Sequence, residues 1–300
     1  MASYETQTVE RTDAIRADAF DMRHTFESGQ PLTFHADYSE DGFSRNLAYS
    51  TGIGRISVSS SGNILHISHS GRYSRATARV EVIKRMGLND DMERIYEGMN
   101  TDPFMDSAIR NFKGMRITEN DSWETTMCFI LSQFNNIKRI RLITRRMIER
   151  FGQPYSDGGT IISMFPSAEA VAGASIGDIN ACGTGFRGKY LKSAAKVCSE
   201  NLDLKKLYGM DYASAKEALM ELDGVGDKVA DCILLFGYHK TEAFPIDTWI
   251  KRIIETVYFK GRNKSIKELH KFAERRWQPE LLGYVQQYLF WNGRSLKVGT

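Results

Sequence analysis

The distribution of apolar and polar residues changes along the chain, and its first third shows the alternation that is typical of strands. In 55–59 and 63–68, apolar and polar residues alternate on either side of Ser60-Ser61-Gly62. This pattern predicts a β-hairpin, because a strand that buries one face has a period of two and tight turns favour serine and glycine. We therefore expect an antiparallel sheet in this region, with further strands at 32–38 and 43–50 and a helix at 76–86.

From Lys113 onward, apolar residues recur every three or four positions instead, which predicts amphipathic helices. Asp121-Ser122-Trp123-Glu124 resembles a helix-capping sequence, and it precedes an apolar run that begins at Met127. Gly152–Gly159 is expected to be a loop. The other helices are expected at 137–151, 167–172, 188–198, 212–222, 227–236, 247–258, 265–277 and 284–291.

These patterns predict an α+β protein with two domains. An N-terminal antiparallel sheet domain with helices would cover 1–112, and an all-helical domain would cover 113–300, with the turn Asn100-Thr101-Asp102-Pro103 near the boundary. The chain has 300 residues, of which 42% are hydrophobic and 26% charged, as is typical of soluble globular proteins. No apolar run approaches the roughly 18 residues that span a bilayer, and 1–16 lacks the apolar segment of a secretory signal. We therefore expect no membrane association and no secretion.

Charge is distributed unevenly between the two parts. Residues 1–112 contain 12 Lys and Arg against 16 Asp and Glu, a net charge of −4. Residues 113–300 contain 28 against 21, a net charge of +7. A basic helical part fits a polyanionic partner such as nucleic acid, although ordinary surface variation would give the same imbalance.

The cysteines and histidines do not form a recognisable metal-binding pattern. The four cysteines are far apart and include no CxxC motif, which favours reduced thiols in an intracellular protein. His66 and His69 lie in one segment, but no HxE or PCxxC motif of the zinc deaminases accompanies them. We expect no metal held by side chains.

The segment Leu222-Asp223-Gly224-Val225-Gly226-Asp227-Lys228 joins two expected helices within about 214–237. Gly224 and Gly226 would permit positive φ, and without Cβ atoms the N–H groups at the start of the second helix can meet a phosphate oxygen. Val225 is expected to fill the space between the helices. A simple helix–helix turn is the alternative, but the compact pattern favours a hairpin that binds a nucleic-acid backbone.

Lys228 and Asp247 are the candidates for chemistry. Lys228 is expected in the first turn of a helix, where the helix dipole and partial burial would favour the neutral, nucleophilic amine. An exposed lysine that contacts phosphate is the alternative. Asp247 lies 19 residues further on, after Pro245 and before a helix, so it could be a helix N-cap. Its carboxylate could also stabilise positive charge on a sugar, and the two residues together favour cleavage of a glycosidic bond.

These residues resemble the helix-hairpin-helix/Gly-Pro-Asp superfamily of base-excision DNA glycosylases, and 117–296 is similar to the 8-oxoguanine DNA glycosylase/AP lyases. The resemblance implies that the helical part is a glycosylase core. The segments that carry it are Asp121-Ser122-Trp123-Glu124 (DPWE in the family), Phe134-Asn135-Asn136-Ile137 (NNNI), Gly183-Thr184-Gly185-Phe186-Arg187 (GLGYR), the hairpin, Phe244-Pro245-Ile246-Asp247, Gln286-Gln287-Tyr288-Leu289-Phe290 and, more weakly, Ser28-Gly29-Gln30 (SGQ).

The resemblance implies that Lys228 attacks C1′ of the deoxyribose, forms a Schiff base and cuts the strand by β-elimination, while Asp247 stabilises the sugar cation. The damaged base, flipped from the duplex, would lie between Phe290 and Cys232. Gln286 would bond to its Watson–Crick edge, and the Gly29 carbonyl would detect the N–H that distinguishes 8-oxoguanine. Core packing is the alternative for Phe290 and Cys232, since both residue types are commonly buried.

At three of the remaining positions where the resemblance implies DNA contacts, this chain has a different residue from the family. Phe134 replaces an asparagine that contacts the orphaned base, Phe186 replaces a tyrosine wedge, and Trp249 replaces a histidine that contacts phosphate. Lesion recognition is therefore expected to be retained, and discrimination of the opposite base is expected to be weak. The other implied DNA contacts are the hairpin residues Gly224, Val225 and Gly226, with Asn136, and Arg139 and Arg187, which would read the opposite cytosine.

The predicted function is thus a bifunctional base-excision repair enzyme for 8-oxoguanine, with double-stranded DNA that contains an oxidised purine as its partner. A 3-methyladenine-type glycosylase, which lacks the lysine, and a non-catalytic DNA-binding protein are the alternatives. No cofactor is expected, and no iron–sulfur cluster, because no cysteine follows Cys232. A monovalent cation at the hairpin is compatible with its carbonyls. We expect a monomer in the cytoplasm with the nucleoid, or in the nucleus of a eukaryote.

Overall fold

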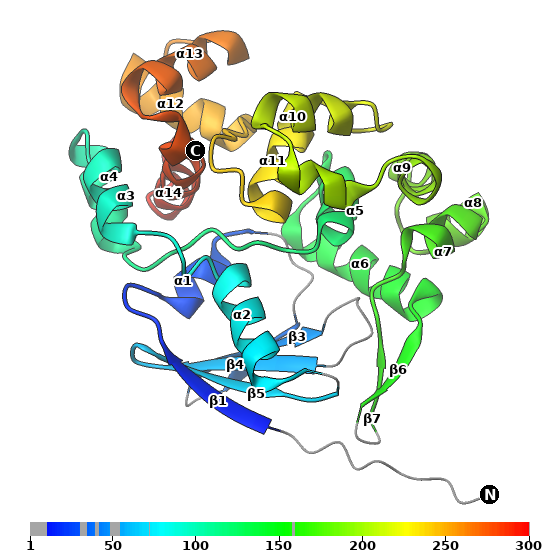
Figure 1. Ribbon diagram of the computed structural model, residues 1–300. Helices are drawn as coiled ribbons and strands as arrows, with labels where there is room; N and C mark the ends of the chain where they lie inside the picture. The colour runs from blue at the N-terminus through cyan, green and yellow to red at the C-terminus, as the bar shows by residue number, and fades with distance from the viewer. Residues whose placement is uncertain are drawn as a thin grey trace, which may run out of the picture. The chain divides into compact units, whose positions relative to one another are not determined.

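The computed structural model describes residues 11–30, 35–39, 42–48, 55–71, 73–157 and 160–299 (Figure 1). These residues form two compact units, each assembled from separate stretches of the chain. The first unit lies within Met1–Asp18, Pro31–Arg85 and Trp123–Leu204, and the second comprises Ala19–Gln30, Met86–Ser122 and Lys205–Thr300. The two domains predicted from the sequence, 1–112 and 113–300, are each one continuous stretch, whereas each unit combines three stretches. The predicted domain boundary stays a prediction.

The first unit contains a five-stranded antiparallel sheet with the order β1-β5-β4-β3-β2. The predicted hairpin is confirmed as β4 and β5, although its turn falls at Gly62-Asn63, since Ser61 pairs with Ile64. Gly62 has a φ of 59°, which a residue with a Cβ rarely adopts. Residues 32–34, 49 and 50 of the predicted strands lie outside the described residues. The strands are β1 (Arg11–Arg16), β2 (His35–Ser39), β3 (Gly42–Ala48), β4 (Arg55–Ser61) and β5 (Ile64–His69).

One face of this sheet is apolar and lies beneath helix α2 (Arg75–Arg85), as Figure 1 shows. The alternation along β4 and β5 places every second side chain on that face. Ala78 and Val82 of α2 are buried with it. The sheet residues that form this core are Ile15, Ile56, Val58, Leu65 and Ile67.

The rest of the first unit is helical apart from a second hairpin. Strands β6 (Pro154–Asp157) and β7 (Thr160–Ser163) pair antiparallel, so the loop predicted at 152–159 is wrong. Proline and glycine dominate the composition there and conceal the pairing. The helices are α5 (Ser122–Ser132), α6 (Ile137–Phe151), α7 (Ala168–Gly173), α8 (Ile176–Ala181), which was not predicted, and α9 (Arg187–Glu200).

The second unit is a bundle around α11 (Asp227–Tyr238) and α14 (Leu282–Ser295), both largely buried. A Cβ on Gly283 would lie 2.4 Å from Leu235 Cδ1, so the two helices approach closely. The predicted helices are confirmed within one turn. The other elements are α1 (Met22–Glu27), α3 (Met92–Met99), α4 (Pro103–Asn111), η1 (Leu204–Gly209), α10 (Tyr212–Met220), α12 (Thr248–Phe259), α13 (Ile266–Arg276) and η2 (Pro279–Leu281).

Helix α4 begins inside the segment that was predicted to be a turn. The Asp102 carboxylate accepts hydrogen bonds from the N–H groups of Phe104 and Met105 at 2.8 and 3.0 Å. Pro103 is tolerated in the first turn because its missing N–H would have no helical partner there. The predicted α+β fold class is confirmed, with an antiparallel sheet near the N-terminus and helices in the remainder. Among the described residues, no helix is both long and apolar enough to cross a bilayer.

Candidate active site and DNA-contact loop

The hairpin of the second unit joins α10 to α11. Gly224 has a φ of 82°, as expected for a left-handed turn residue. Gly226 is extended, with a φ of −95°, so the expectation of positive φ was wrong for this glycine. It is the N-cap of α11, and no atom lies within 4 Å of where its Cβ would be, which leaves the start of the helix open to an approaching group. Val225 is 5% exposed and fills the space beneath the turn.

Lys228 lies in the first turn of α11, as predicted, and is half-buried. Burial lowers the pKa of its amine, but the neighbouring Cys232, Asp247 and Asp231 outweigh burial, so the pKa is raised overall. The expectation that the environment alone would favour the neutral amine was therefore wrong. The sequence argument considered desolvation and the helix dipole, but it left out Asp231 and Cys232 of the same helix, and only the fold brings Asp247 close. Lys228 is charged at rest and must lose a proton before it can act as a nucleophile.

Cys232 lies one turn after Lys228 on the same face of α11. It is 4% exposed, and burial raises the pKa of its thiol to about 11, although Lys228 opposes this shift. At neutral pH it is therefore a thiol that is hydrogen-bonded to the Lys228 side chain. Such a polarisable, uncharged group is compatible with an aromatic base.

A network of charges that the sequence did not predict lies behind Lys228. The Lys216 ammonium is 2.8 Å from a carboxylate oxygen of both Asp227 and Asp231, and Tyr212 Oη donates to Asp231 at 2.5 Å. Asp231 is fully buried, and burial raises the pKa of its carboxyl group despite Lys216. Lys216 precedes the hairpin and Asp231 follows it, so the ion pair connects α10 to α11 across the turn. Only the spacing of opposite charges on two helical faces could have indicated it.

Part of this network has the spacing of a metal site. Among the described residues, Asp227, Asp231 and His270 offer ligand atoms that lie within 4.8 Å of one another. The Lys216 ammonium already contacts both carboxylates, so no cation is needed to neutralise them. A divalent ion would also be repelled by this ammonium. The cluster is best described as an ion-paired network.

Asp247 is the N-cap of α12, as the sequence predicted. Its carboxylate accepts a hydrogen bond from the N–H of Ile250 at 2.8 Å, which fixes the side chain at the start of the helix. Its negative charge also reaches Lys228 and raises the pKa of that amine. The capping bond and the electrostatic contact are compatible, because a carboxylate has more acceptor positions than one cap bond uses.

Gln286 lies on α14 and is 6% exposed. Its Oε1 is buried, and among the described residues it has no hydrogen-bond partner. An unpaired buried acceptor is costly unless a ligand satisfies it. Its neighbour Gln287 instead donates to the Ser28 carbonyl at 2.9 Å, which anchors the segment that carries Gly29 against α14.

Gly29 has a φ of 82° between two anchored residues. Ser28 donates to the Thr25 carbonyl at 2.8 Å, and the Gln30 amide nitrogen donates to the carbonyls of Thr25 and Arg116 at 2.9 and 2.6 Å. The Gln30 amide oxygen accepts from the N–H of Thr118 at 2.7 Å. The peptide at Gly29 is thus held rigidly in the same unit as Gln286. Phe290 and Trp249, also in this unit, are half-exposed, and both contact Arg294.

The loop between α5 and α6 belongs to the first unit and has a different character. Phe134 is 96% exposed and has a φ of 46°, an unusual backbone conformation for a bulky residue. The Asn135 amide donates to the Leu131 carbonyl at 2.9 Å, and Asn136 caps α6 by accepting from the N–H of Arg139 at 3.0 Å. A strained and exposed aromatic side chain in an otherwise well-anchored loop is typical of a functional residue.

Arg187 holds this loop in place. Its guanidinium donates to the carbonyls of Gln133 and Phe134, the latter at 2.8 Å, and it is only 5% exposed. Burial and the nearby charge of Arg139 lower the pKa of Arg187. The arginine predicted to read the opposite base is therefore occupied with the backbone of its own loop. Arg139 is exposed, and Phe186 is 49% exposed beneath the Arg187 guanidinium.

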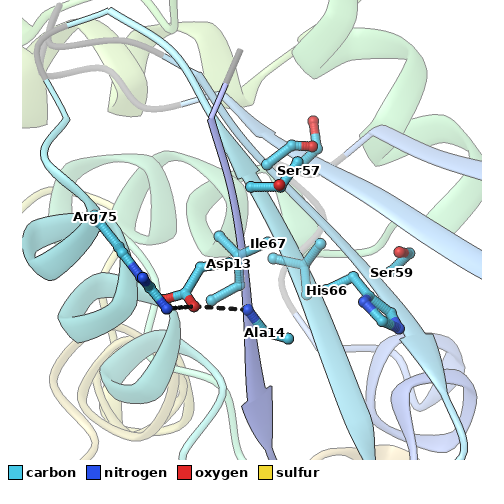
Figure 2. Close-up of a pocket in the computed structure, with 10 residues that line it drawn as sticks. Asp13, Ala14, Ser57, Ser59, His66, Ile67 and Arg75 are labelled. Atoms are coloured by element: carbon cyan, nitrogen blue, oxygen red, sulfur yellow. Dashed lines mark hydrogen bonds and ion pairs between the residues drawn. The ribbon is translucent and has the colours of Figure 1, made fainter.

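A cavity in the first unit is not lined by these residues. Its volume is about 740 Å³, and it opens on the sheet of the first unit. Figure 2 shows that Arg75 points toward Asp13 of β1, and that His66 lies on the neighbouring strand. Arg75 bonds to Asp13 at 2.7 Å and lowers the pKa of this carboxyl group to about 2, so the charges satisfy each other. The cavity contains no candidate catalytic residue, and we assign it no role.

Comparisons with known proteins agree with this geometry. Residues 127–279 match the HhH-GPD superfamily of base excision DNA repair proteins, and residues 14–126 match the N-terminal domain of 8-oxoguanine DNA glycosylase. A probable N-glycosylase/DNA lyase of Methanothermobacter thermautotrophicus is 31% identical over 297 residues, which cover 92% of this chain and 94% of that protein.

Solved structures extend the likeness over nearly the whole chain. MBOgg1 in complex with a low-affinity DNA ligand has a TM-score of 0.85 at 33% identity and covers 97% of this chain and 99% of its own. The Clostridium acetobutylicum 8-oxoguanine glycosylase/lyase, bound to double-stranded DNA with cytosine opposite 8-oxoguanine, has a TM-score of 0.84 at 26% identity, with 97% and 98% covered.

The hairpin, the lysine and the capping aspartate define a base-excision DNA repair protein, and the chain belongs to the HhH-GPD superfamily. Within this superfamily, it is an enzyme of the 8-oxoguanine DNA glycosylase/lyase type. The family and the enzyme class predicted from the sequence are confirmed.

Proposed function

We propose that this chain excises 8-oxoguanine from double-stranded DNA and then cleaves the strand, with Lys228 as the nucleophile. The observation that carries the proposal is the Lys228 amine at the open N-terminus of α11, within the electrostatic reach of the Asp247 carboxylate. A helix-hairpin-helix that only binds a phosphate backbone needs no such pair. A monofunctional 3-methyladenine-type glycosylase would activate water and would not need the lysine.

The reaction balances with groups of the protein and the substrate alone. Lys228 gives up a proton, its Nζ forms a bond to C1′, and the C1′–N9 bond breaks with its electron pair on the base, which takes up the proton that Lys228 released. The sugar ring then opens as C1′–O4′ breaks, O4′ is protonated, and the lysine is left as a Schiff base. Loss of a C2′ proton breaks the C3′–O3′ bond and cuts the strand on the 3′ side.

Asp247 would stabilise positive charge on the sugar as the base leaves. Its cap bond to Ile250 holds the carboxylate before the reaction begins, so little reorganisation is required in the transition state. The same charge raises the pKa of Lys228 in the resting enzyme. Positive charge that develops on the sugar near Asp247 would offset the charge of this carboxylate and so lower the pKa of Lys228.

Base recognition would use the anchored residues of the second unit. The unpartnered Oε1 of Gln286 can accept a hydrogen bond from the Watson–Crick edge of a purine, which carries N–H groups. The carbonyl of Gly29 would accept the N7–H that only the oxidised base has. Phe290 and the Cys232 thiol would contact the two faces of the flipped base.

DNA binding would involve both units. The hairpin residues Gly224, Val225 and Gly226 present the open start of α11 to a phosphate. Phe134 would enter the space that the flipped base leaves, and Asn136 ends its loop as the N-cap of α6. Phe186, at the start of α9, would act as a wedge. Arg139 is exposed and can read the opposite base, whereas Arg187 would act by fixing the Phe134 carbonyl.

We also propose a simple molecular context. The carbonyls of the hairpin could ligate a monovalent cation, and no iron–sulfur cluster is expected because no cysteine follows Cys232. A monomer is sufficient, since every group that the proposed chemistry requires comes from one chain. Chromosomal DNA as substrate would place the enzyme at the nucleoid, or in the nucleus of a eukaryote.

Borohydride trapping tests the proposal. Wild-type protein with an 8-oxoguanine duplex and borohydride should give a covalent protein–DNA adduct, and Lys228→Gln should give none while still binding the duplex. Lys267→Gln, which removes an exposed lysine of α13, is the matched control and should trap normally. Base release without an adduct in the wild type would favour the monofunctional alternative. Binding without base release would favour a non-catalytic protein.

A further inference from the structure

One face of α14 carries a polar residue, an aromatic residue and a cation in a row. Gln286, Phe290 and Arg294 are spaced four residues apart, so their side chains share this face. Their exposure increases along the row: Gln286 is buried, Phe290 is half-buried and Arg294 is exposed. The rise of an α-helix separates the first and last by about 12 Å, comparable to the reach of one nucleotide from base edge to phosphate.

Arg294 is held between two aromatic rings. Its guanidinium carbon lies 5.4 Å from the centroid of the Phe290 ring and 5.4 Å from that of Trp249. The guanidinium carbon of Arg252 also lies 5.4 Å from the Trp249 centroid. Trp249 therefore positions two arginines through cation–π contacts, which favour Trp above other rings.

The stem of Arg252 is fixed from the other side by the C-terminal turn. The N–H of Val298 donates to the Gly293 carbonyl at 2.8 Å and folds this turn back after α14. A Cβ on Gly299 would lie 2.6 Å from Arg252 Cγ, so the backbone of the turn packs directly against the arginine stem. The guanidinium is thereby presented over Trp249 with little freedom.

The two arginines have no acidic counterpart that would explain their proximity. Across the described ranges, neither Arg252 nor Arg294 forms an ion pair with a carboxylate, and both are exposed. Two cations on one indole ring repel each other, and an anion that contacts both removes this penalty. The planar guanidinium matches a phosphate through paired hydrogen bonds.

We propose that Arg252 and Arg294 form a phosphodiester-binding site that holds the phosphate of the extruded nucleotide while its base reaches Gln286. The ligand is the DNA backbone, so this inference rests on the proposed function and adds a second point of attachment for the nucleotide. Trp249 carries no charge itself and would position both arginines through its ring.

The test is the salt dependence of binding to a duplex with a tetrahydrofuran abasic analogue, measured by fluorescence anisotropy between about 50 and 200 mM salt. Each neutralised phosphate contributes about 0.9 to the slope of log K against log salt, so Arg252→Ala with Arg294→Ala, which removes both ligands of one phosphate, should reduce the slope by about 1. Lys271→Ala with Arg275→Ala removes the same charge from exposed positions on α13 and should leave the slope nearly unchanged. Trp249→Leu should weaken binding several-fold although it removes no charge.

Equal slopes for the two double variants would overturn the inference, because general surface charge would then account for binding. So would a Trp249→Leu protein that is folded, by circular dichroism, and binds as the wild type does. The assay uses no chemistry, which separates it from the proposed function. If the wild type released no 8-oxoguanine but the arginine variant still lost about one unit of salt slope, the phosphate site would stand and the proposed reaction would fall.

Discussion

The proposed catalytic and base-binding residues of the second unit and the loop around Phe134 in the first unit differ in almost every physical respect. Lys228, Asp247 and Gln286 are buried or half-buried, and a hydrogen bond holds Asp247 while nearby charges hold Lys228 within the same unit. Phe134 is 96% exposed with a left-handed backbone, although the carbonyls of its loop are fixed by Arg187. Chemistry requires groups that are in place beforehand, whereas a residue that enters the duplex must project from the surface.

The difference also has a consequence for specificity. In the proposed function, recognition of the lesion uses buried polar atoms such as Gln286 Oε1, for which a wrong partner leaves a costly unpaired group. The proposed contact with the orphaned base uses an exposed apolar ring, which stacks on any base. We therefore expect strict selection of the damaged base and tolerant reading of the base opposite.

The largest expected effect is at Asp247. Asp247→Asn retains a side-chain acceptor for the helix cap but removes the charge, and we expect base excision to fall about 10²-fold or more. Asp211→Asn, at the N-cap of α10, is the matched control and should excise normally, since Asp211 accepts a similar bond from Ser214. Single-turnover excision checks both. If the Asp247 variant lost only melting temperature, the carboxylate would be a cap alone.

A smaller effect is expected at Gln286. Gln286→Ala removes one buried hydrogen-bonding group, and selection of 8-oxoguanine over guanine should weaken by roughly 1–3 kcal/mol. Binding to undamaged duplex should change little, because phosphate contacts dominate it and carry no base information. Competition between lesion and undamaged duplexes measures the difference. Equal losses on both duplexes would show that Gln286 is structural. Selection of the lesion could then not be assigned to this buried polar group.

The Phe134 loop provides the converse test. The wild type should excise 8-oxoguanine opposite all four bases with a mild preference for cytosine. Phe134→Asn adds a polar reader, and asparagine also tolerates the left-handed backbone, so the preference should sharpen by about 1–3 kcal/mol. Phe134→Leu, which adds no donor, should leave the preference unchanged. A wild type that already rejects adenine by several orders of magnitude would contradict this reading of Phe134.

The smallest effect concerns the stability of the second unit. His239 Nε2 lies 2.9 Å from Asp90; burial lowers the pKa of His239, but the bond and charge of Asp90 outweigh burial and raise it overall. This stabilisation is complete below the unfolded histidine pKa of about 6.5 and is lost as pH rises through the higher folded pKa. His239→Asn should therefore lower the melting temperature most at acidic to neutral pH, and the deficit should shrink at alkaline pH. Lys260→Asn, also at a left-handed helix end, is the control and should show no such trend.

Several features were determined by the sequence alone because they depend on local physics. The alternation in 55–68 predicted the β4–β5 hairpin, the apolar spacing after residue 113 predicted most helices, and Asp247 was recognised as an N-cap from Pro245 and the helix that follows. The enzyme family was predicted from a resemblance that the hairpin, Lys228, Asp247 and several short motifs carry. All of these signals involve residues close together in the chain, where periodicity and capping are decisive.

Only the tertiary structure decided how the functional groups are held and charged. The raised pKa of Lys228 depends on Cys232 of its own helix and on Asp247, which is 19 residues away, and the occupation of Arg187 depends on carbonyls more than 50 residues away. The pairing of Lys216 with Asp231 and the stacking of Arg294 on Trp249 also join separate helices. Electrostatic interactions depend on distance in space and on burial, and neither quantity is a local property of the sequence.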